Sequence, residues 1–189
     1  TLKDGISDIL VHLYYAVFAD YDVITRWAVV ENASAAEVNI SKVMSMTVDF
    51  DNMRYDVISN YGSWCRERHL ERGPVKHGLF TTGSRRGASS HTHNPFMIIC
   101  DKTASETAGD CYGATLVYSG SYKMTVEGTR YNFTRFNAGI NPDGFGWVLE
   151  PGKTFTSPEA VMTYSENGLT GLSHNFNNII RKRLCRGKY

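Results

Sequence analysis

Hydrophobic and polar residues alternate along the first half of the chain. In residues 9–17 every odd position is apolar, and a second alternating run, residues 23–30, follows the polar link at residues 20–22. Alternation with a period of two places the apolar side chains on one face of a β-strand. Two such runs joined by a short link predict an antiparallel hairpin. A third run, residues 38–48, alternates in the same way and predicts one more strand.

The same pattern continues through the middle of the chain, separated by turn sequences such as Ser119-Gly120 and Pro151-Gly152. Further strands are expected at residues 55–59, 76–81, 96–100, 112–119, 122–127, 131–137 and 160–164. About ten strands in one chain indicate a large antiparallel β-sandwich. The chain has neither the Gly-x-Gly-x-x-Gly nor the P-loop pattern, which argues against a nucleotide-binding α/β domain.

The period changes after Gly168. Apolar residues then recur at spacings of three and four, at Leu169, Leu172, Phe176, Ile179, Ile180 and Leu184. This spacing predicts an amphipathic helix, and the cations Arg181, Lys182, Arg183 and Arg186 suit its C-terminal end. We therefore divide the chain into a sandwich over residues 1–167 and a helix over residues 168–185.

Composition narrows the class of protein. The chain has 189 residues, 42% hydrophobic and 21% charged, with a net charge of +1. These values are typical of one soluble globular domain, and a near-neutral surface argues against nucleic acid or an anionic membrane as the partner. The four cysteines are widely spaced and form no Cys-x-x-Cys pair. Free thiols in a reducing compartment explain them best, which predicts a cytoplasmic location.

Residues 85–96 contain the densest group of polar side chains in the chain. The run reads Arg-Arg-Gly-Ala-Ser-Ser-His-Thr-His-Asn-Pro-Phe. Such loops are held in one shape by bonds from side chains to the backbone, so this segment is expected to form a site or a docking surface. The segment from Trp64 to Glu71 is a second candidate, because it combines an aromatic face with alternating charges.

For each kind of catalysis or metal binding that these residues could support, the sequence favours a structural role instead. Glu67 lies between Arg66 and Arg68, which favours a paired, ionised carboxylate over a general acid with a raised pKa. His91 and His93 lack the spacing and the companion carboxylates of a metal site, so no metal is expected. Ser89 and Ser90 lack the Gly-x-Ser-x-Gly elbow of a serine nucleophile.

Several blocks of sequence carry a resemblance to a known family. They are Asp22-Val-Ile-Thr-Arg26, Gly62-Ser-Trp-x-Arg-Glu-Arg68, Arg86-Gly-x-Ser-Ser-His-x-His-Asn-Pro-Phe96, Gly113-x-x-Leu-Val-Tyr-Ser-Gly120 and Phe155-x-x-Pro-Glu-Ala-Val-x-x-Tyr-Ser165. In these blocks and in their order, the chain resembles the N-terminal region of the family 36 glycoside hydrolases, the large bacterial and fungal α-galactosidases.

The resemblance implies a galactose mutarotase-like antiparallel β-supersandwich, mostly β, partial, and ending in one C-terminal helix. In that family it precedes a catalytic (β/α)₈ barrel. The family removes terminal α-linked galactose from melibiose, raffinose and stachyose with retention of configuration. It uses no cofactor, and its members often form homo-oligomers.

The chain departs from the family pattern where the catalysis is done. The Lys-Trp-Asp motif of the family nucleophile and the acid/base aspartate of the barrel are both absent. No catalytic residue is therefore assigned, and this chain alone is expected to be inactive. The resemblance implies that the two polar segments contact the barrel or another subunit, or lie near the mouth of the sugar site. The residues proposed for that role are Trp64, Arg66, Glu67, Arg86, His91 and Asn94.

Two other functions remain open at this point. The chain could be a stand-alone carbohydrate-binding sandwich with Trp64 as its platform, since sugar recognition uses an aromatic face and planar hydrogen-bonding groups. The supersandwich also supports aldose mutarotase chemistry, for which His91 or His93 with Glu67 is the available pair.

Overall fold

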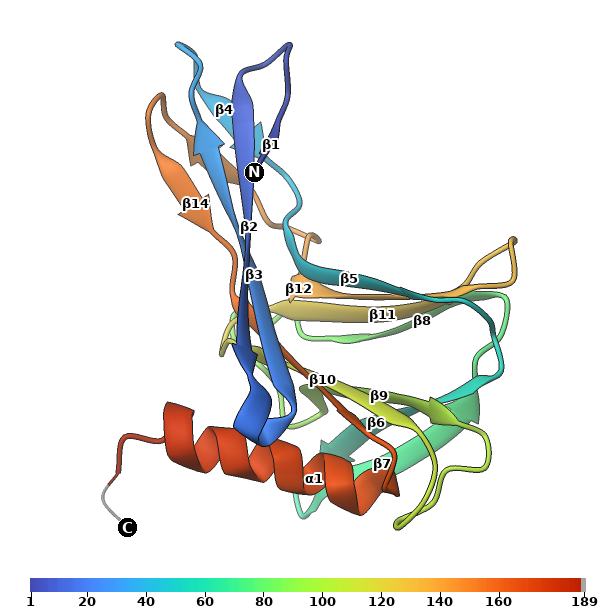
Figure 1. The fold of residues 1–189 in the computed structure, drawn as a ribbon. Helices are drawn as coiled ribbons and strands as arrows, with labels where there is room; N and C mark the ends of the chain where they lie inside the picture. The colour runs from blue at the N-terminus through green and yellow to red at the C-terminus, as the bar shows by residue number, and fades with distance from the viewer. Residues whose placement is uncertain (188–189) are drawn as a thin grey trace.

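The structure, a computed structural model, describes residues 1–187 and consists mainly of antiparallel strands (Figure 1). Its larger sheet has nine strands in the order β1-β2-β3-β15-β10-β9-β6-β7, with β14 also paired to β3. These strands are β1 (Leu2–Lys3), β2 (Ile9–Phe18), β3 (Val23–Asn32), β6 (Tyr55–Ser63), β7 (Arg66–Pro74), β9 (His93–Asp101), β10 (Cys111–Val117), β14 (Thr154–Thr156) and β15 (Glu159–Ser165).

A three-stranded sheet lies over one face of the larger sheet. Its order is β11-β12-β5, and β8 lies beside β11. The strands of this layer are β5 (Met44–Phe50), β8 (Gly78–Gly83), β11 (Tyr122–Gly128) and β12 (Thr134–Ile140). A separate two-stranded sheet joins β4 (Val38–Ile40) to β13 (Trp147–Leu149). The predicted fold, mostly antiparallel β with a single C-terminal α-helix, is confirmed.

The main core lies between these two layers. Its buried side chains come from both, and they include Met97, Ile99, Ala114 and Leu116 of the larger sheet and Met46, Tyr122, Met124, Val126 and Phe136 of the smaller one. Residues two apart along each strand point to the same face. The apolar alternation of the sequence therefore becomes one buried layer between the sheets.

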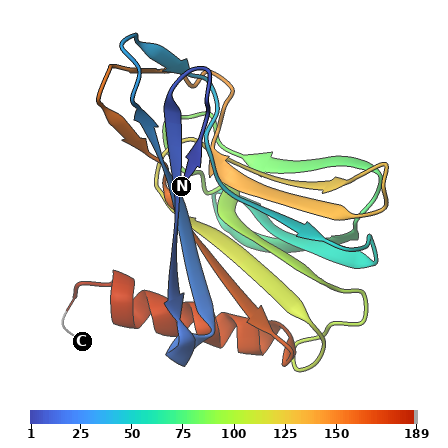
Figure 2. The same ribbon diagram turned by 45° about the horizontal axis from the view of Figure 1, so that its top comes forward.

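The helix α1 (Gly168–Ile179) covers the opposite face of the larger sheet and lies beside the turn end of the β2–β3 hairpin (Figures 1 and 2). Leu172, Phe176 and Ile179 form a second core with Val23, Ile98 and Val161. The apolar stripe, predicted to continue to Leu184, ends at Ile179, because residues Ile180–Leu184 form an exposed π-helical turn. Carbonyl groups of Ser105 and Glu106 accept bonds from the first amides of α1, which otherwise have no partner within a helix.

The predicted hairpin is confirmed. Strands β2 and β3 pair in antiparallel register from Ile9 opposite Asn32 to Phe18 opposite Val23. A short 3₁₀ turn, Ala19–Tyr21, and the left-handed Asp22 reverse the chain between them. The strands expected at residues 55–59, 96–100, 112–119, 122–127 and 160–164 are also present, with different ends.

Some of the predicted strands were wrong in extent. The run at residues 38–48 is two strands, β4 and β5, which belong to different sheets because the chain turns at residues 41–43. The strand expected at residues 131–137 begins only at Thr134, since Asn132 has φ 61° and forms a turn. The strand expected at residues 76–81 is β8, Gly78–Gly83. Strand β7 was not predicted, because its residues are almost all polar and exposed.

All four cysteines are free thiols. Cys65 and Cys185 are exposed, whereas Cys100 and Cys111 are buried opposite each other on β9 and β10. Burial raises the pKa of the Cys100 thiol to about 11, so it stays protonated and unreactive at neutral pH. No helix within residues 1–187 combines the length and the apolar character that a membrane crossing requires.

Candidate functional site

The β6–β7 hairpin carries the first group of predicted site residues. Ser63 pairs with Arg66, so Trp64 and Cys65 form its tip, and Cys65 has φ 58°. Trp64 is 86% exposed, and its ring therefore projects from the end of the sheet. Glu67 accepts a hydrogen bond on Oε1 from the amide of Cys65 at 3.0 Å. This bond closes the turn.

The interpretation of Glu67 as an ion-paired carboxylate is wrong, because none of the salt bridges among the described residues involves it. In an extended strand the side chains of both neighbours, Arg66 and Arg68, point to the face opposite that of Glu67. The turn geometry instead directs Glu67 back to the amide of Cys65. Its role in this structure is to hold the hairpin tip.

The loop before β9 carries the second group. Arg86 donates from Nη1 to Ser90 and Thr92 at 3.5 Å each, and its amide donates to the hydroxyl of Ser84. The Ser84 hydroxyl donates to the carbonyl of Ala88 at 2.6 Å. These short-range bonds hold the loop in one shape, as the polar composition of the segment predicts.

The predicted loop at residues 85–96 was too long, because His93 and Asn94 already belong to β9. His91 lies in the loop and is exposed. His93 Nδ1 and Asn94 Oδ1 are buried without a hydrogen-bond partner in the described part of the chain. Buried polar atoms normally have partners, so these two are the unusual groups of the segment.

The structure brings the two groups to the same end of the larger sheet. The amide of Gly62 donates to the carbonyl of Thr92 at 2.9 Å, and Tyr61 lies opposite His93 across β6 and β9. The ring of Tyr61 also lies beside His69 of β7, with 5.6 Å between centroids. The hairpin tip and the loop therefore form one polar surface, which we call the tip–loop surface: residues 62–67, 84–92, His93 and Asn94.

Two residues that sequence reasoning missed support this surface. Tyr122 is fully buried and donates its hydroxyl to the carbonyl of His93 at 2.8 Å, and its burial raises its pKa. Gly62 is required by space, because a Cβ atom there would lie 2.6 Å from the carbonyl oxygen of Arg66. Tyrosines are so common in this sequence that Tyr122 carried no signal, and Gly62 lay beyond the strand expected at residues 55–59, although a glycine within a strand is a sign of close backbone approach.

Substitution of Gly62 tests how the tip is held. Gly62→Ala is expected to reduce the free energy of unfolding by about 2 kcal/mol, because the methyl group would push β7 away from β6. Gly73→Ala on the same hairpin is the control, since no atom lies within 4 Å of a Cβ there. Urea unfolding monitored by circular dichroism compares the two. Equal midpoints would show that the tip tolerates the methyl group.

The tip–loop surface does not have the carboxylate geometry of a glycosidase. Glu67 is its one acidic residue, and the next carboxylate along β7, Glu71, lies four residues further, which is about 13 Å along an extended strand. Retaining enzymes need carboxyl groups about 5–5.5 Å apart, and inverting enzymes about 6.5–9.5 Å. No hydrogen bond joins Glu67 to His91 or His93 in the described residues, and residues 1–187 contain no group of three metal-ligating side chains.

The sandwich that carries the tip–loop surface belongs to a family of N-terminal domains found in glycoside hydrolases. Residues 1–150 match the glycosyl hydrolase family 36 N-terminal domain, and the chain belongs to that family. It is 42% identical over 188 residues to the bifunctional alpha-galactosidase/sucrose kinase AgaSK of Mediterraneibacter gnavus. It is 41% identical to alpha-galactosidase AgaA of Geobacillus stearothermophilus. Both matches cover 100% of this chain, which spans only 20% and 26% of those two relatives.

Solved structures agree with this assignment. An AgaA variant from Geobacillus stearothermophilus in complex with stachyose matches with a TM-score of 0.96 and 41% identity. The galactosidase domain of AgaSK matches with the same TM-score and 42% identity. Each match covers 98% of this chain and 26% of the solved chain.

Proposed function

We propose that this chain is the non-catalytic N-terminal portion of a retaining α-galactosidase that removes terminal α-linked galactose from melibiose- and raffinose-type oligosaccharides. The observation that carries the proposal is the match at 41–42% identity along the whole chain to alpha-galactosidases, one of which, AgaA, was solved as variants in complex with stachyose and with raffinose. The wide separation of Glu67 and Glu71 supports a non-catalytic role for this part of the enzyme.

The proposed role of the tip–loop surface is to contact the catalytic (β/α)₈ barrel or another subunit and to shape the mouth of the sugar site. Trp64, Arg66, Arg86 and His91 supply exposed aromatic and cationic groups. The bonds through Glu67, Gly62 and Ser84 hold the backbone that carries them. A surface that is rigid before contact loses little conformational entropy on docking.

Two assays test the proposal. The parent polypeptide is expected to release galactose from melibiose and raffinose, and the 189-residue chain alone is expected to release none above the buffer rate. Galactose release by the isolated chain that disappears when one of its own carboxylates is replaced would refute the non-catalytic role.

A double substitution tests the contact role. Trp64→Ala with Arg66→Ala in the parent enzyme is expected to lower kcat/KM on raffinose by about tenfold or more, or to shift its oligomeric mass. Arg54→Ala, an exposed residue in the turn before β6, is the control and is expected to leave both quantities unchanged. If the double variant matches the control, the tip–loop surface has no such contact.

A stand-alone carbohydrate-binding module is the second candidate, favoured by the exposed ring of Trp64 on a well-held hairpin. Titration of the 189-residue chain with millimolar galactose, followed by NMR, separates the two. Chemical-shift changes confined to the tip–loop surface would support binding, and an unchanged spectrum would exclude it.

We also propose that the parent enzyme is cytoplasmic and forms homo-oligomers. The free state of all four thiols supports a reducing compartment. Mass photometry of the parent enzyme tests its assembly, and a single-subunit mass at all concentrations would contradict the oligomer.

A further inference from the structure

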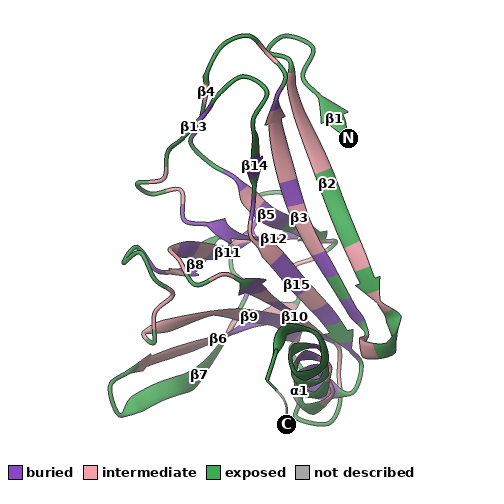
Figure 3. Ribbon diagram, turned by 90° about the vertical axis from the view of Figure 1, so that its left-hand side faces the viewer, coloured by how far each residue is buried: buried purple, intermediate pink, exposed green. Residues whose placement is uncertain are grey.

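Two of the four thiols face each other in the core beneath α1. Cys100 of β9 lies directly opposite Cys111 of β10, and both residues are 0% exposed. They belong to the second core, together with Leu172 and Phe176 of α1. Figure 3 shows the buried parts of β9 and β10 beside this helix. The pair lies outside the tip–loop surface, and none of the roles proposed for that surface involves it.

The hydrogen-bond register brings the backbones of the two cysteines close together. In the neighbouring pair of the ladder, the amide of Asp101 donates to the carbonyl of Asp110 at 3.0 Å. Bonded and non-bonded pairs alternate along an antiparallel ladder, so Cys100 and Cys111 form a non-bonded pair, with Cα atoms about 4.5 Å apart. Disulfides join cysteines whose Cα atoms lie about 4.4–6.8 Å apart. A bond between these two sulfurs therefore needs little movement of the backbone.

The β9–β10 turn, residues 102–110, closes over the pair. Ala104 of the turn is buried in the same core as the two thiols. Carbonyls of the turn, at Ser105 and Glu106, accept bonds of 3.0 and 2.9 Å from the first amides of α1. The start of the helix therefore anchors one side of the turn.

Arg72 of β7 anchors the other side. Its terminal nitrogens donate to three carbonyls between Asp101 and Ala104 at 2.7–3.0 Å, and its Nε binds Asp56 at 2.8 Å. Asp56 lies opposite Cys100 across β6 and β9, so the guanidinium is held beside the thiols. Burial raises the pKa of both thiols, and the charge of Arg72 opposes part of that rise. While the turn is closed, both thiols are protonated and shielded from solvent.

We propose that Cys100 and Cys111 are a redox-sensitive pair, which hydrogen peroxide converts to a disulfide when the β9–β10 turn opens. The resting pair is reduced, because both thiols are free in the structure. The disulfide would link β9 to β10 directly beneath α1, and a dithiol reductant would restore the thiols. The inference goes beyond the proposed function and does not depend on the hydrolysis of α-galactosides.

The reaction consumes one molecule of hydrogen peroxide for each disulfide. One cysteine, as its thiolate, attacks a peroxide oxygen and breaks the O–O bond, which leaves a sulfenic acid on the sulfur. The released hydroxide takes up the proton of that thiol and becomes water. The second sulfur then displaces the sulfenic hydroxyl, which leaves with the second thiol proton as water. The two thiols lose two electrons, and peroxide is reduced to two waters.

Opening of the turn is a local event. Two of the three bonds from Arg72 to the turn lie at exposed positions, and the remaining anchors are the first amides of α1. Segments held by exposed hydrogen bonds open with less free energy than the whole fold. An open turn also removes the acceptors of those amides, so oxidation of the pair is coupled to release of the first turn of α1.

Peptide mapping of the parent polypeptide tests the pairing directly. The folded protein is treated with excess hydrogen peroxide, alkylated and digested with trypsin, which cleaves after Lys102, between the two cysteines. Peptides 87–102 and 103–123 are expected to appear joined by a disulfide and to separate in dithiothreitol. If exposed Cys65 is oxidised and these two peptides stay unlinked, the proposal is overturned.

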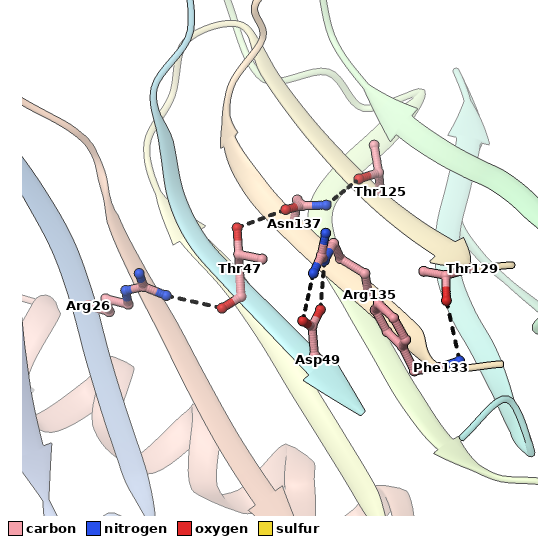
Figure 4. Close-up of polar contacts among 8 residues, drawn as sticks. All are labelled: Arg26, Thr47, Asp49, Thr125, Thr129, Phe133, Arg135 and Asn137. Atoms are coloured by element: carbon pink, nitrogen blue, oxygen red, sulfur yellow. Dashed lines mark hydrogen bonds and ion pairs between the residues drawn. The ribbon is translucent and has the colours of Figure 1, made fainter. Parts of the chain in front are cut away.

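Substitution of Arg72 tests the role of the turn. Arg72→Met is expected to increase the rate of linkage at least about tenfold, because it releases one side of the turn. Arg135→Met is the matched control, since Arg135 binds Asp49 through two bonds of 2.7 and 2.8 Å in the smaller sheet (Figure 4). The control is expected to stay within about twofold of the unsubstituted rate. Equal rates in the two variants would overturn the proposal.

Urea separates local opening from global unfolding and needs no substitution. Below the unfolding transition, the rate of linkage in the unsubstituted parent is expected to change by less than about twofold, since opening one turn exposes little surface. A rate that rises steeply with urea would show that the thiols react only in the unfolded chain, which would also overturn the proposal.

Discussion

Phe176→Ala is expected to reduce the free energy of unfolding of this chain by about 3–5 kcal/mol. Phe176 is buried where α1 meets the larger sheet, and its ring packs edge-on against Phe96 at 5.4 Å between centroids. It also lies directly over Gly113, where a Cβ atom would be 2.6 Å from Cε2. A backbone surface that contacts the ring so closely cannot collapse into the vacated space. Truncation therefore loses the transfer free energy and leaves a cavity as well.

The measurement is a urea titration followed by both circular dichroism and tryptophan fluorescence. His174→Ala, on the exposed side of the same helix, is the control and is expected to change stability by no more than about 0.5 kcal/mol. Because domains of this kind have a total stability of about 5–15 kcal/mol, this loss removes a large fraction of the free energy of unfolding. A loss below about 1 kcal/mol would mean that α1 is not docked on the sheet in solution.

Arg72→Met is expected to reduce the free energy of unfolding by about 2–4 kcal/mol. Arg72 of β7 binds Asp56 of β6 from Nε at 2.8 Å. Its two terminal nitrogens donate to the carbonyls of Ala104, Asp101 and Lys102 at 2.7–3.0 Å. The hydrogen bond to Asp56 raises the pKa of Arg72, so the guanidinium remains charged at every ordinary pH. Methionine keeps the length of the side chain and leaves these acceptors unpaired.

Two further variants make the Arg72 prediction specific. Arg72→Lys is expected to recover only part of the loss, because an ammonium group cannot reproduce the planar fork that reaches several carbonyls at once. Arg54→Met, an exposed arginine before β6, is the control and is expected to be close to neutral. Thermal unfolding compares the melting temperatures of the three variants. If Arg72→Met melts with the control, the fork does not stabilise the turn after β9.

The candidate site was predictable only where local chemistry decides the outcome. The dense polar loop at Arg86 and His91 is held by its own hydroxyl groups, and short-range bonds of this kind follow from residue type. The role of Glu67 was not predictable from its arginine neighbours, because the left-handed Cys65 turns the backbone amide toward its carboxylate. The Gly62–Thr92 bond joins segments thirty residues apart, and no local pattern encodes such a contact.

The sequence by itself determined the class of fold, the β2–β3 hairpin and the stripe of α1, because periods of 2 and 3.6 residues set which side chains share a face. Its motifs also identified the family. Only the tertiary structure decided that residues 38–48 divide between two sheets and that polar β7 is a strand, since edge position and turns depend on distant neighbours. It alone decided that Leu13, Tyr15 and Val17 on the apolar face of β2 are exposed within residues 1–187, because a pattern specifies which face needs a partner and not which segment supplies it.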